Sequence, residues 1–356
     1  MTNVCIVGDG LASLTLAKAL VNQGIFVDFF SEQKVKKIDK SRTIGISKIN
    51  TDFFIKEILN IKKLLWEINK IEIYSDNFKD QKIMNFEKKS DNLFSMLKNF
   101  ELYKLLITSL KKNNLFKQRR NYKDLIFKNY DLVINCEKNN FISKKYFSRN
   151  LIKNYRSYAH TTIIDHKKYS RNNTAIQIFT NKGPLAFLPI SDSKTSVVYS
   201  CRGNNNINFD NIIKKYNKDY SVLKINKISS FKLTLVNLRN YHYKNILAFG
   251  DLLHKLHPLA GQGFNMTIRD IKILLDIIKE KINLGLPLDS SVCDQFENKL
   301  RHKNYIFSNS IDLIHEFFNF ERKLNNNVLS KSLKILGKNS YINKLFTKVA
   351  DKGINF

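Results

Sequence analysis

The spacing of apolar residues predicts that the chain begins with a strand, a tight turn and a helix. Asn3–Val7 is a short apolar run of strand type, and it leads directly into Gly8-Asp9-Gly10. The next apolar residues recur at helical spacing, and they are Leu11, Leu14, Ala17, Leu20 and Val21. A second apolar strand is expected over Phe26–Phe30. This order of elements is typical of a fold that binds a dinucleotide.

The middle of the chain shows strand-type composition bounded by turn residues, which predicts further strands rather than helices. Ile71–Ser75 and Ile83–Phe86 flank a polar turn over Asp76–Lys79, and we interpret them as a hairpin. Thr174–Phe179 and Thr195–Ser200 have the same strand composition. Together these segments predict a mostly antiparallel sheet that forms a second structural unit.

A second glycine motif follows the last predicted strand, Asn245–Phe249. Gly250 and Asp251 stand directly after it, and residues 261–265 (GQGFN) open a segment with helical spacing of its apolar residues. An acid at the end of a strand can accept hydrogen bonds from a sugar hydroxyl. Free N–H groups at the start of a helix can bind a pyrophosphate or an electron-rich ring edge. The motif thus offers two contacts to one extended anionic cofactor, and the chain from about Leu284 onward is expected to be helical.

The first motif has the spacing of a dinucleotide site with two departures. Gly8 allows a tight turn, and Gly10 lets the backbone approach a pyrophosphate without an intervening Cβ. Ser13 stands where a third glycine is usual, so we expect the helix to pack slightly farther from the strand. The acid that binds the ribose is expected about 20 residues on, where Glu32 is the nearest carboxylate. Glu32 is either that ligand, brought into register by a bulge, or a solvated glutamate whose place Asp9 and a water could take.

Taken together, these motifs resemble the flavoprotein aromatic hydroxylases, and most closely the ubiquinone-biosynthesis hydroxylase family. In that family the Gly-Asp pair continues into His-Pro, Ala-Gly-Gln-Gly and Asn, and then into Arg-Asp, as residues 257–265 and Arg269-Asp270 do here. Further matches keep the family order along the chain, and they are Arg42-Thr43, Gly183–Pro189 with Ser191-Asp192, and Phe231–Leu235. The resemblance covers essentially the whole chain.

The resemblance implies an α/β fold like that of para-hydroxybenzoate hydroxylase. This fold has a Rossmann-like FAD-binding domain, an inserted mostly antiparallel substrate sheet and a helical C-terminal region. The FAD-binding domain would be discontinuous and comprise residues 1–70, 95–150 and 240–290. The substrate sheet would comprise residues 71–94 and 151–239, and the C-terminal helical region residues 291–356.

The resemblance also implies the chemistry. A reduced flavin reacts with dioxygen to form a C4a-hydroperoxide, which transfers oxygen to the ring of a polyprenylated phenol, and NAD(P)H or another donor supplies the electrons. The residues expected to hold FAD are Gly8, Gly10, Ser13, Glu32, Arg42, Asp251, Gly261, Gln262, Gly263, Phe264 and Asn265. The residues expected to line the substrate site are His257, Pro258, Leu185 and Phe187. No protein acid or base is assigned a catalytic role.

A third motif departs from the family pattern. After a strand such as Asp131–Ile134 these hydroxylases usually carry Ala-Asp-Gly, but this chain continues with Asn-Cys-Glu-Lys at residues 135–138. Lys138 replaces a glycine suited to positive φ or close backbone approach. The change either weakens contacts to flavin and nicotinamide or marks an ordinary strand-end loop. Two alternative functions therefore stay open: a flavin-binding but catalytically weakened structural subunit of a quinone-biosynthesis assembly, and a hydroxylase of another aromatic compound.

Histidines and cysteines give no sign of a metal or redox centre. We interpret His254 as bonded to the backbone, and His257 as either shaping the loop before Pro258 or facing the substrate. Additional ligands do not gather near them at metal-binding spacing, so no metal is expected. The cysteines are scattered as in proteins of a reducing compartment, and they are Cys5, Cys136, Cys201 and Cys293.

The composition adds a strong positive charge. The 356 residues include 60 Lys and Arg and 31 Asp and Glu, which gives a formal net charge of +29. Such a charge attracts nucleic acid or anionic lipid. The cations are dispersed, however, and the chain is also rich in Asn, Ile, Phe and Tyr, a bias that an A/T-rich genome produces. Because no recognised nucleic-acid-binding motif is present, we expect no nucleic-acid partner.

The last residues of the chain predict an amphipathic surface. No signal peptide or bilayer-spanning apolar run is recognised, so we expect a protein that is cytoplasmic or peripheral on the inner face of the membrane. Apolar residues recur there at three- and four-residue steps between lysines, and they are Leu329, Leu333, Leu336, Ile342, Leu345, Phe346 and Val349. This segment either contacts anionic lipid or docks on the flavin domain. Other quinone-biosynthesis proteins are further expected partners.

Overall fold

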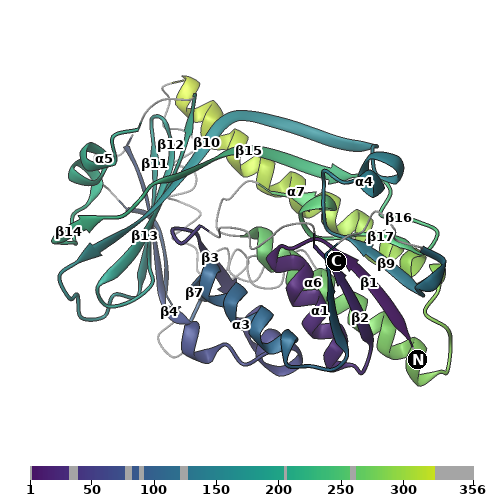
Figure 1. Ribbon diagram of the computed structural model, residues 1–356. Helices are drawn as coiled ribbons and strands as arrows, with labels where there is room; N and C mark the ends of the chain where they lie inside the picture. Colours follow the sequence, from purple (N-terminus) through teal and green to yellow (C-terminus); the bar gives the residue numbers. More distant parts are fainter. Residues whose placement is uncertain are drawn as a thin grey trace.

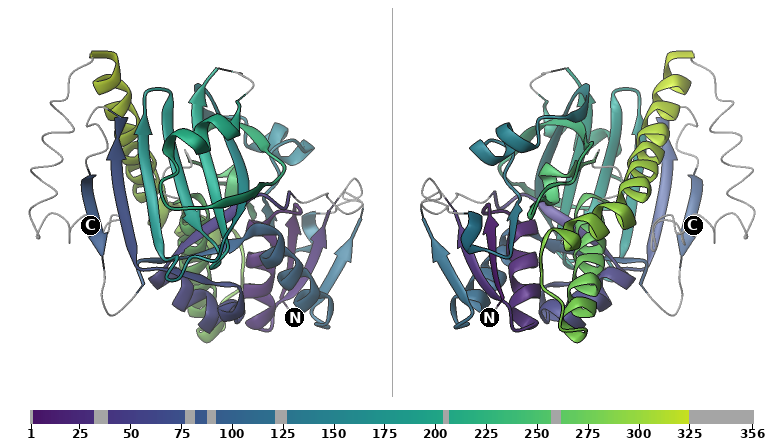
Figure 2. Two further views of the ribbon diagram at one scale, coloured as in Figure 1. Left: turned by 90° about the vertical axis from the view of Figure 1, so that its left-hand side faces the viewer. Right: turned by 90° about the vertical axis from the view of Figure 1, so that its right-hand side faces the viewer.

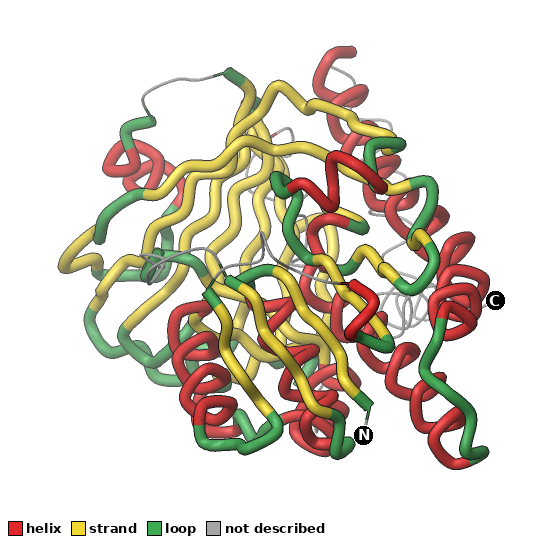
Figure 3. Tube along the Cα trace, turned by 45° about the vertical axis from the view of Figure 1, so that its right-hand side comes forward, coloured by secondary structure: helices red, strands yellow, loops and turns green. Residues whose placement is uncertain are grey.

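The chain folds around two large sheets and one small sheet (Figure 1). The structure is a computed structural model, and it describes residues 2–31, 39–76, 82–87, 92–120, 127–203, 207–256 and 262–324. In Figure 3 most of the helices lie along the bottom and the right-hand side of the molecule. The expected α/β fold with an additional antiparallel sheet is therefore confirmed.

The first large sheet is built from segments that lie far apart in the sequence. Its strand order is β16-β17-β9-β1-β2-β8, and every neighbouring pair is parallel except β16 with β17. The strands are β1 (Asn3–Val7), β2 (Phe26–Phe30), β8 (Phe116–Arg119), β9 (Leu132–Asn135), β16 (His242–Tyr243) and β17 (Ile246–Ala248). Parallel strands that alternate with helices form the arrangement typical of a dinucleotide-binding domain.

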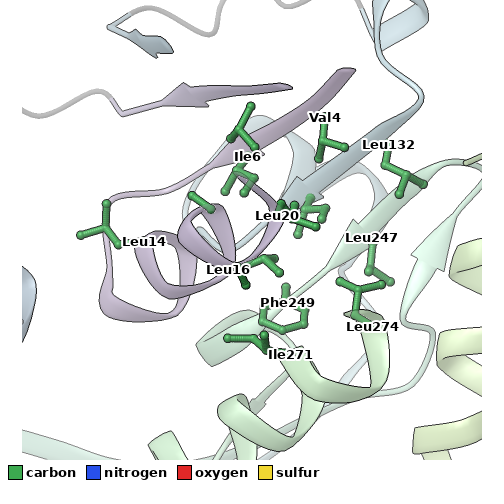
Figure 4. Packing of buried hydrophobic residues seen from close by; sticks show 14 of the residues in the cluster. Val4, Ile6, Leu14, Leu16, Leu20, Leu132, Leu247, Phe249, Ile271 and Leu274 are labelled. Atoms are coloured by element: carbon green, nitrogen blue, oxygen red, sulfur yellow. The ribbon is translucent and has the colours of Figure 1, made fainter. Parts of the chain in front are cut away.

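Three long helices pack together beside this sheet and form the main core with it. They are α1 (Leu11–Asn22), α3 (Asn99–Lys111) and α6 (Gln262–Asn283). The apolar stripe predicted for the first helix is confirmed, because all its members are buried except Leu11, which is half-buried. Figure 4 shows how the core brings strands and helices together, with Val4, Ile6, Leu14, Leu16, Leu20, Leu132, Leu247, Phe249, Ile271 and Leu274 in view.

The second large sheet has nine strands and is mostly antiparallel. Its order is β18-β15-β10-β13-β12-β11-β5-β6, with β14 paired to β10, and β11 with β5 is its parallel pair. The predicted hairpin and the two predicted later strands are confirmed as β5 with β6, β11 and β13. The strands are β5 (Lys70–Ser75), β6 (Lys82–Glu87), β10 (Asn150–His166), β11 (Thr174–Thr180), β12 (Gly183–Pro189), β13 (Lys194–Arg202), β14 (Val222–Ile225), β15 (Ser229–Leu238) and β18 (His254–Lys255).

A small sheet and several short helical segments complete the description. The sheet has the order β3-β7-β4, with β3 (Thr43–Ser47), β4 (Trp66–Ile68) and β7 (Phe94–Lys98). Met96 of β7 and Ile68 of β4 share a buried cluster with Ala175 of β11, which joins the small sheet to the nine-stranded sheet. The short segments are α2 (Lys48–Phe53), a π-helical turn (Phe54–Ile58), α4 (Phe141–Tyr146), α5 (Phe209–Tyr216) and 3-10 turns at Lys62–Leu64, Phe127–Asn129 and Gly250–Leu252.

The last described helix, α7 (Ser290–Leu324), connects the two large sheets (Figure 2). Residues one turn apart on α7 reach three different elements. Asn304 donates to Asp270 of α6 (3.3 Å), and Ser308 accepts from Asn237 of β15 (2.7 Å). One turn further on, Asp312 accepts from the Tyr155 hydroxyl of β10 (2.7 Å). This polar stripe fixes α6 relative to the nine-stranded sheet.

Several expectations fall on parts of the chain that the structure does not describe. Glu32, His257, Pro258 and Gly261 lie outside the described residues, and so does the amphipathic segment from Leu329 onward. The division into three domains stays a prediction. No helix within the described residues has the length and apolar character that crossing a membrane requires.

Candidate functional site

The parallel strands place both glycine motifs at one edge of the six-stranded sheet. Val7 pairs with Phe30 on one side and with Asn135 on the other, and Ala248 also pairs with Asn135. These four residues are the carboxyl ends of β2, β1, β9 and β17. Ligands of open α/β sheets bind in the crevice outside the carboxyl ends of the strands. A ligand is therefore expected at the loops that follow these four strands.

The first loop requires glycine at residue 8 and leaves free space beside residue 10. Gly8 has φ +128°, and a Cβ there would lie 3.2 Å from Cβ of Cys136. The Gly8 amide donates to the Phe30 carbonyl (2.9 Å), so the turn is held close to the sheet. An ideal Cβ on Gly10 would meet no described heavy atom within 4 Å. Because Gly10 is the N-cap of α1, the positive end of the helix dipole faces this open space.

Ser13 is accommodated inside the first turn of α1. Its side chain is fully buried, and its hydroxyl donates to the Gly10 carbonyl (2.8 Å). The hydroxyl thus needs no outside partner. Ser13 leaves the amide groups at the start of α1 available, because it bonds a carbonyl rather than an amide.

The second motif rests directly on the first. Gly250 has φ +62°, and a Cβ there would lie 2.7 Å from Cβ of Ala12 in α1. No other residue type fits this position without a shift, since real Cβ atoms do not approach so closely and the conformation is left-handed. Asp251 follows immediately and its side chain is exposed. Two motifs that are far apart in the sequence therefore converge beside the N-terminus of α1.

A buried His–Asp pair lies behind the second motif. His254 Nε2 of β18 is hydrogen bonded to the Asp270 carboxylate of α6, and the two side chains are 2% and 0% exposed. The expectation that His254 bonds to the backbone was wrong in this respect. Asp270 also accepts from Asn304 of α7 (3.3 Å). Burial raises the pKa of Tyr241, and the nearby charge of Asp270 raises it further. The pair fixes the strand after Asp251 to the helix that begins at Gln262.

Sequence reasoning missed this pair, although a signal for it was present. Asp270 stands between Ile268 and Ile271, which both carry the buried apolar stripe of α6. A carboxylate on the buried side of a helix needs a partner, because unpaired burial is costly. The partner could not be named from spacing alone, since His254 lies on a different element.

The residues at the start of α6 have different surroundings. The Asn265 side chain is buried; it accepts from the Ser47 amide (2.9 Å) and from Asn50 (2.9 Å), and it donates to the Gly45 carbonyl (2.9 Å). It thereby fixes α6 to β3 and α2. Phe264 is partly buried against the main core. Gly263 is exposed, and an ideal Cβ on it would meet no described heavy atom within 4 Å.

Arg42 lies at the boundary between the small sheet and the nine-stranded sheet. Its guanidinium carbon is 4.8 Å from the centroid of the Phe231 ring on β15. Burial raises the pKa of nearby Asp39, but hydrogen bonds from Ser229 and Ser41 and the charge of Arg42 lower it more. Arg42 is exposed and thus remains accessible to an anionic group.

The loop after β9, whose sequence differs from the Ala-Asp-Gly motif of the hydroxylases, is held by a buried polar network rather than by a glycine. Asn135 accepts from the Glu137 amide (3.2 Å) and from Asn140 (2.7 Å), and it donates to the Ser143 hydroxyl (2.7 Å). The described non-glycine residues with positive φ are Arg156, Arg171 and Lys244, so residue 138 does not need the left-handed conformation. The Lys138 side chain is exposed. These observations favour the interpretation of this segment as an ordinary strand-end loop.

Cys136 lies between the two motifs as an unreactive thiol. Burial raises its pKa, and the charges of Glu137 and Asp251 raise it further. A thiol with a raised pKa carries little thiolate, so it is a poor nucleophile. The influence of Asp251 on Cys136 also shows that the two loops are close in space.

Leu185 and Phe187 lie on the face of β12 that is covered by α5. Both are buried in a cluster with Phe209 and Ile213 of α5. Leu188, which follows them, packs in the other cluster with Ile68 and Met96 of the small sheet. Successive residues of a strand point to opposite faces, so these contacts identify the two faces of β12.

Among the described residues, no group of three His, Cys, Asp or Glu side chains is placed to hold a metal ion.

Comparisons with known proteins agree with this geometry. No protein-family model matches the chain. The chain is similar to 3-demethoxyubiquinol 3-hydroxylase of Escherichia coli, at 29% identity over 40% of this chain and 39% of the relative. It is also similar to the mitochondrial ubiquinone biosynthesis monooxygenase COQ6 of Schizosaccharomyces pombe, at 22% identity over 63% of this chain and 57% of the relative. The matched part therefore spans less than two thirds of the length of either relative.

Solved structures show the same fold over nearly the whole chain. A p-nitrophenol 4-monooxygenase from Pseudomonas putida superposes with a TM-score of 0.75, at 12% identity over 99% of both chains. The 2-methyl-3-hydroxypyridine-5-carboxylic acid oxygenase gives a TM-score of 0.73, at 10% identity over 94% of this chain and 96% of the other. Both the fold class and the resemblance to the ubiquinone-biosynthesis hydroxylases are confirmed by these similarities.

Proposed function

We propose that the protein is an FAD-dependent monooxygenase that hydroxylates the aromatic ring of a polyprenylated phenol in ubiquinone biosynthesis. The observation that carries the proposal is the contact between Gly250 and Ala12, which joins the two glycine motifs at the carboxyl edge of the sheet. An FAD molecule is long enough to need both motifs, since its pyrophosphate and its ribose are bound by different groups. Two proteins to which the chain is similar are named a 3-demethoxyubiquinol 3-hydroxylase and a ubiquinone biosynthesis monooxygenase.

The described residues suit an anionic dinucleotide. The open space at Gly10 admits a pyrophosphate to the N-terminus of α1, where free amides and the helix dipole favour negative charge. Asp251 is exposed and can accept hydrogen bonds from a ribose hydroxyl. Arg42 can pair with a phosphate. Gly263 leaves room for close approach of the flavin at the start of α6, and Asn265 positions that helix against β3.

The reaction needs a dry and oriented pocket as well as the cofactor. When bound, FAD would activate dioxygen for transfer of one oxygen atom to an electron-rich ring, with electrons from NAD(P)H or another donor. The protein would contribute orientation of the ring and exclusion of water. We propose His257 and Pro258 for the ring contact. Since Leu185 and Phe187 pack against α5, we place the apolar wall on the other face of β12, at Leu188.

No observation favours a catalytically weakened subunit. That alternative depended on Ser13 and Lys138. Ser13 is satisfied within α1, and Lys138 has an ordinary backbone conformation and an exposed side chain. The proposal therefore keeps an active enzyme, and contacts with a membrane surface and with other quinone-biosynthesis proteins are part of it.

The function is tested by complementation in a strain that lacks its own ring hydroxylase of ubiquinone biosynthesis. Expression of the wild-type chain is expected to restore ubiquinone and to remove the accumulated unhydroxylated intermediate. An Asp251→Ala variant, made at equal abundance, is expected to restore less. Full folding and flavin content without restoration of any hydroxylation step would contradict the proposed substrate class.

A further inference from the structure

One corner of the molecule exposes large apolar side chains in a group. The corner consists of α4, the first residues of β10 and the β16–β17 hairpin. Its apolar members Phe141, Leu151, Ile152 and Tyr243 are 41%, 41%, 54% and 45% exposed. Single exposed apolar residues are ordinary, but a gathering of them marks a surface that binds something.

Two contacts hold the segments of this corner together. The rings of Tyr146 on α4 and Tyr243 on the hairpin are stacked, with centroids 4.5 Å apart. The Arg239 amide, just after β15, donates to the carbonyl of Arg149, just before β10 (3.1 Å). Figure 1 shows α4 and the hairpin together at the right-hand end of the paired strands β10 and β15. We call this surface the α4 corner.

Cations are interleaved with the apolar side chains of the α4 corner. Lys145 and Lys244 lie over the rings of Tyr146 and Tyr243, with the ammonium nitrogens 5.3 and 5.8 Å from the ring centroids. The other exposed cations of the corner are Lys144, Arg149 and Arg239. Among the described residues, three acids also lie beside the hairpin. The Asp131 carboxylate accepts from the Asn3 amide (2.8 Å), and His242 Nε2 of β16 lies 3.1 Å from Asp294 and 3.7 Å from Glu297 of α7. The corner is therefore both positively charged and apolar.

This combination fits an anionic lipid surface better than a nucleic acid. Phosphate groups of either partner would attract the cations. Leu151 and Ile152 are successive residues of β10, so they point to opposite faces and only one of them lies on any single face of the corner. An exposed aliphatic side chain gains nothing from a charged nucleic-acid backbone. In the headgroup region of a membrane such a side chain can enter the apolar layer while the lysines remain at the phosphates. Charge complementarity and exposed apolar area thus point to the same partner.

We propose that the protein lies on anionic membranes through the α4 corner. The choice of a lipid partner rests on the proposed function, because a polyprenylated phenol is held in the bilayer. The corner is also well placed for such a substrate. Asn140, the N-cap of α4, is hydrogen bonded to Asn135 at the carboxyl end of β9 (2.7 Å). The α4 corner therefore adjoins the edge of the sheet at which the cofactor is proposed to bind.

The test is sedimentation of the full chain with vesicles of phosphatidylcholine, with and without phosphatidylglycerol, at low and high salt. The apolar variant is Phe141→Ser with Ile152→Ser, and the charge variant is Lys144→Glu with Lys145→Glu and Arg149→Glu. Their matched controls are exposed residues elsewhere, Leu223→Ser with Leu284→Ser and Lys111→Glu with Lys112→Glu and Lys117→Glu. Urea unfolding of each variant checks that the fold is intact.

Wild-type protein is expected to bind the anionic vesicles, and more weakly at high salt. The charge variant should lose about a hundredfold in partition coefficient, since each cation at an anionic surface contributes about fivefold. The apolar variant should lose about tenfold or more, and both controls should bind several times more tightly than the α4 variants. Equal binding by α4 variants and controls would overturn the proposal. So would loss of binding only on substitution of Leu333 and Leu345, which would place the contact in the C-terminal segment.

The outcome is independent of the proposed enzymatic function. Vesicle binding is measured without cofactor or substrate. A protein that binds FAD and hydroxylates but ignores anionic vesicles contradicts the α4 corner alone. A protein that binds vesicles through the corner but never retains FAD contradicts the enzymatic proposal and leaves the surface standing.

Discussion

Replacing Gly250 by alanine tests the junction between the two glycine motifs. The added Cβ would lie 2.7 Å from Cβ of Ala12, in a residue with φ +62°. The left-handed conformation costs a non-glycine residue about 1–2 kcal/mol, and the overlap adds about 1–3 kcal/mol unless the chain shifts. We therefore expect Gly250→Ala to lower the free energy of unfolding by about 2–5 kcal/mol. Any shift that relieves the overlap would move Asp251 away from α1 and lower FAD affinity by about tenfold.

The chain offers a matched control for this change. Gly285 has φ +67°, and an ideal Cβ on it would meet no described heavy atom within 4 Å. Gly285→Ala thus has the same backbone cost without the contact, and it should leave FAD affinity unchanged. Ala12→Gly combined with Gly250→Ala should recover part of the lost stability and affinity. Urea unfolding and fluorescence titration with FAD measure both effects. Equal losses for the two single glycine variants would refute the reasoning.

Three further changes have definite expected results. Asp251→Ala should weaken FAD retention about tenfold or more in the same titration, because a hydrogen bond to a charged group contributes about 1.5–3 kcal/mol. Unchanged retention would exclude Asp251 from the site. Asp270→Ala should lower the free energy of urea unfolding by about 3–5 kcal/mol, since it leaves buried His254 without its partner; a loss like that of a surface pair would show that the His–Asp pair is dispensable. Burial raises the pKa of Glu72, but hydrogen bonds from Lys70, Lys82 and Tyr74 lower it from the usual 4.5 to about 2. The contribution of Glu72 to stability is present above pH 4.5 and is lost as the pH falls toward 2. The free energy of unfolding should therefore fall less steeply with decreasing pH in Glu72→Gln than in the wild type. Equal slopes for the two proteins would contradict the lowered pKa of Glu72.

Local patterns were sufficient to predict much of the fold. The strand, glycine turn and helix at the start of the chain depend on neighbours in sequence, and so do the hairpin of β5 with β6 and the helix after Asn265. Each of these elements buries one face, so its apolar spacing reports its structure directly. The resemblance supplied the order in which the elements assemble, which spacing alone does not determine.

Contacts between distant segments could not be predicted in the same way. The overlap that requires glycine at residue 250 involves Ala12, and the partner of Asp270 is His254 on another element. The alternation of β12 showed that Leu185 and Phe187 share one face, but it did not show which face α5 covers. The two-residue alternation of a strand assigns its side chains to two faces, but it does not show which element packs on each face. Only the assembled sheet identifies those elements.

The most direct test of the account is equilibrium titration of the purified wild-type chain with FAD, followed by the flavin spectrum. We expect saturable noncovalent binding of one FAD per chain, with the bound spectrum of a flavoprotein. Binding should be weakened by Asp251→Ala and by Gly250→Ala but not by Gly285→Ala. A folded wild-type protein that is colourless as purified and fails to bind added FAD would contradict the central claim.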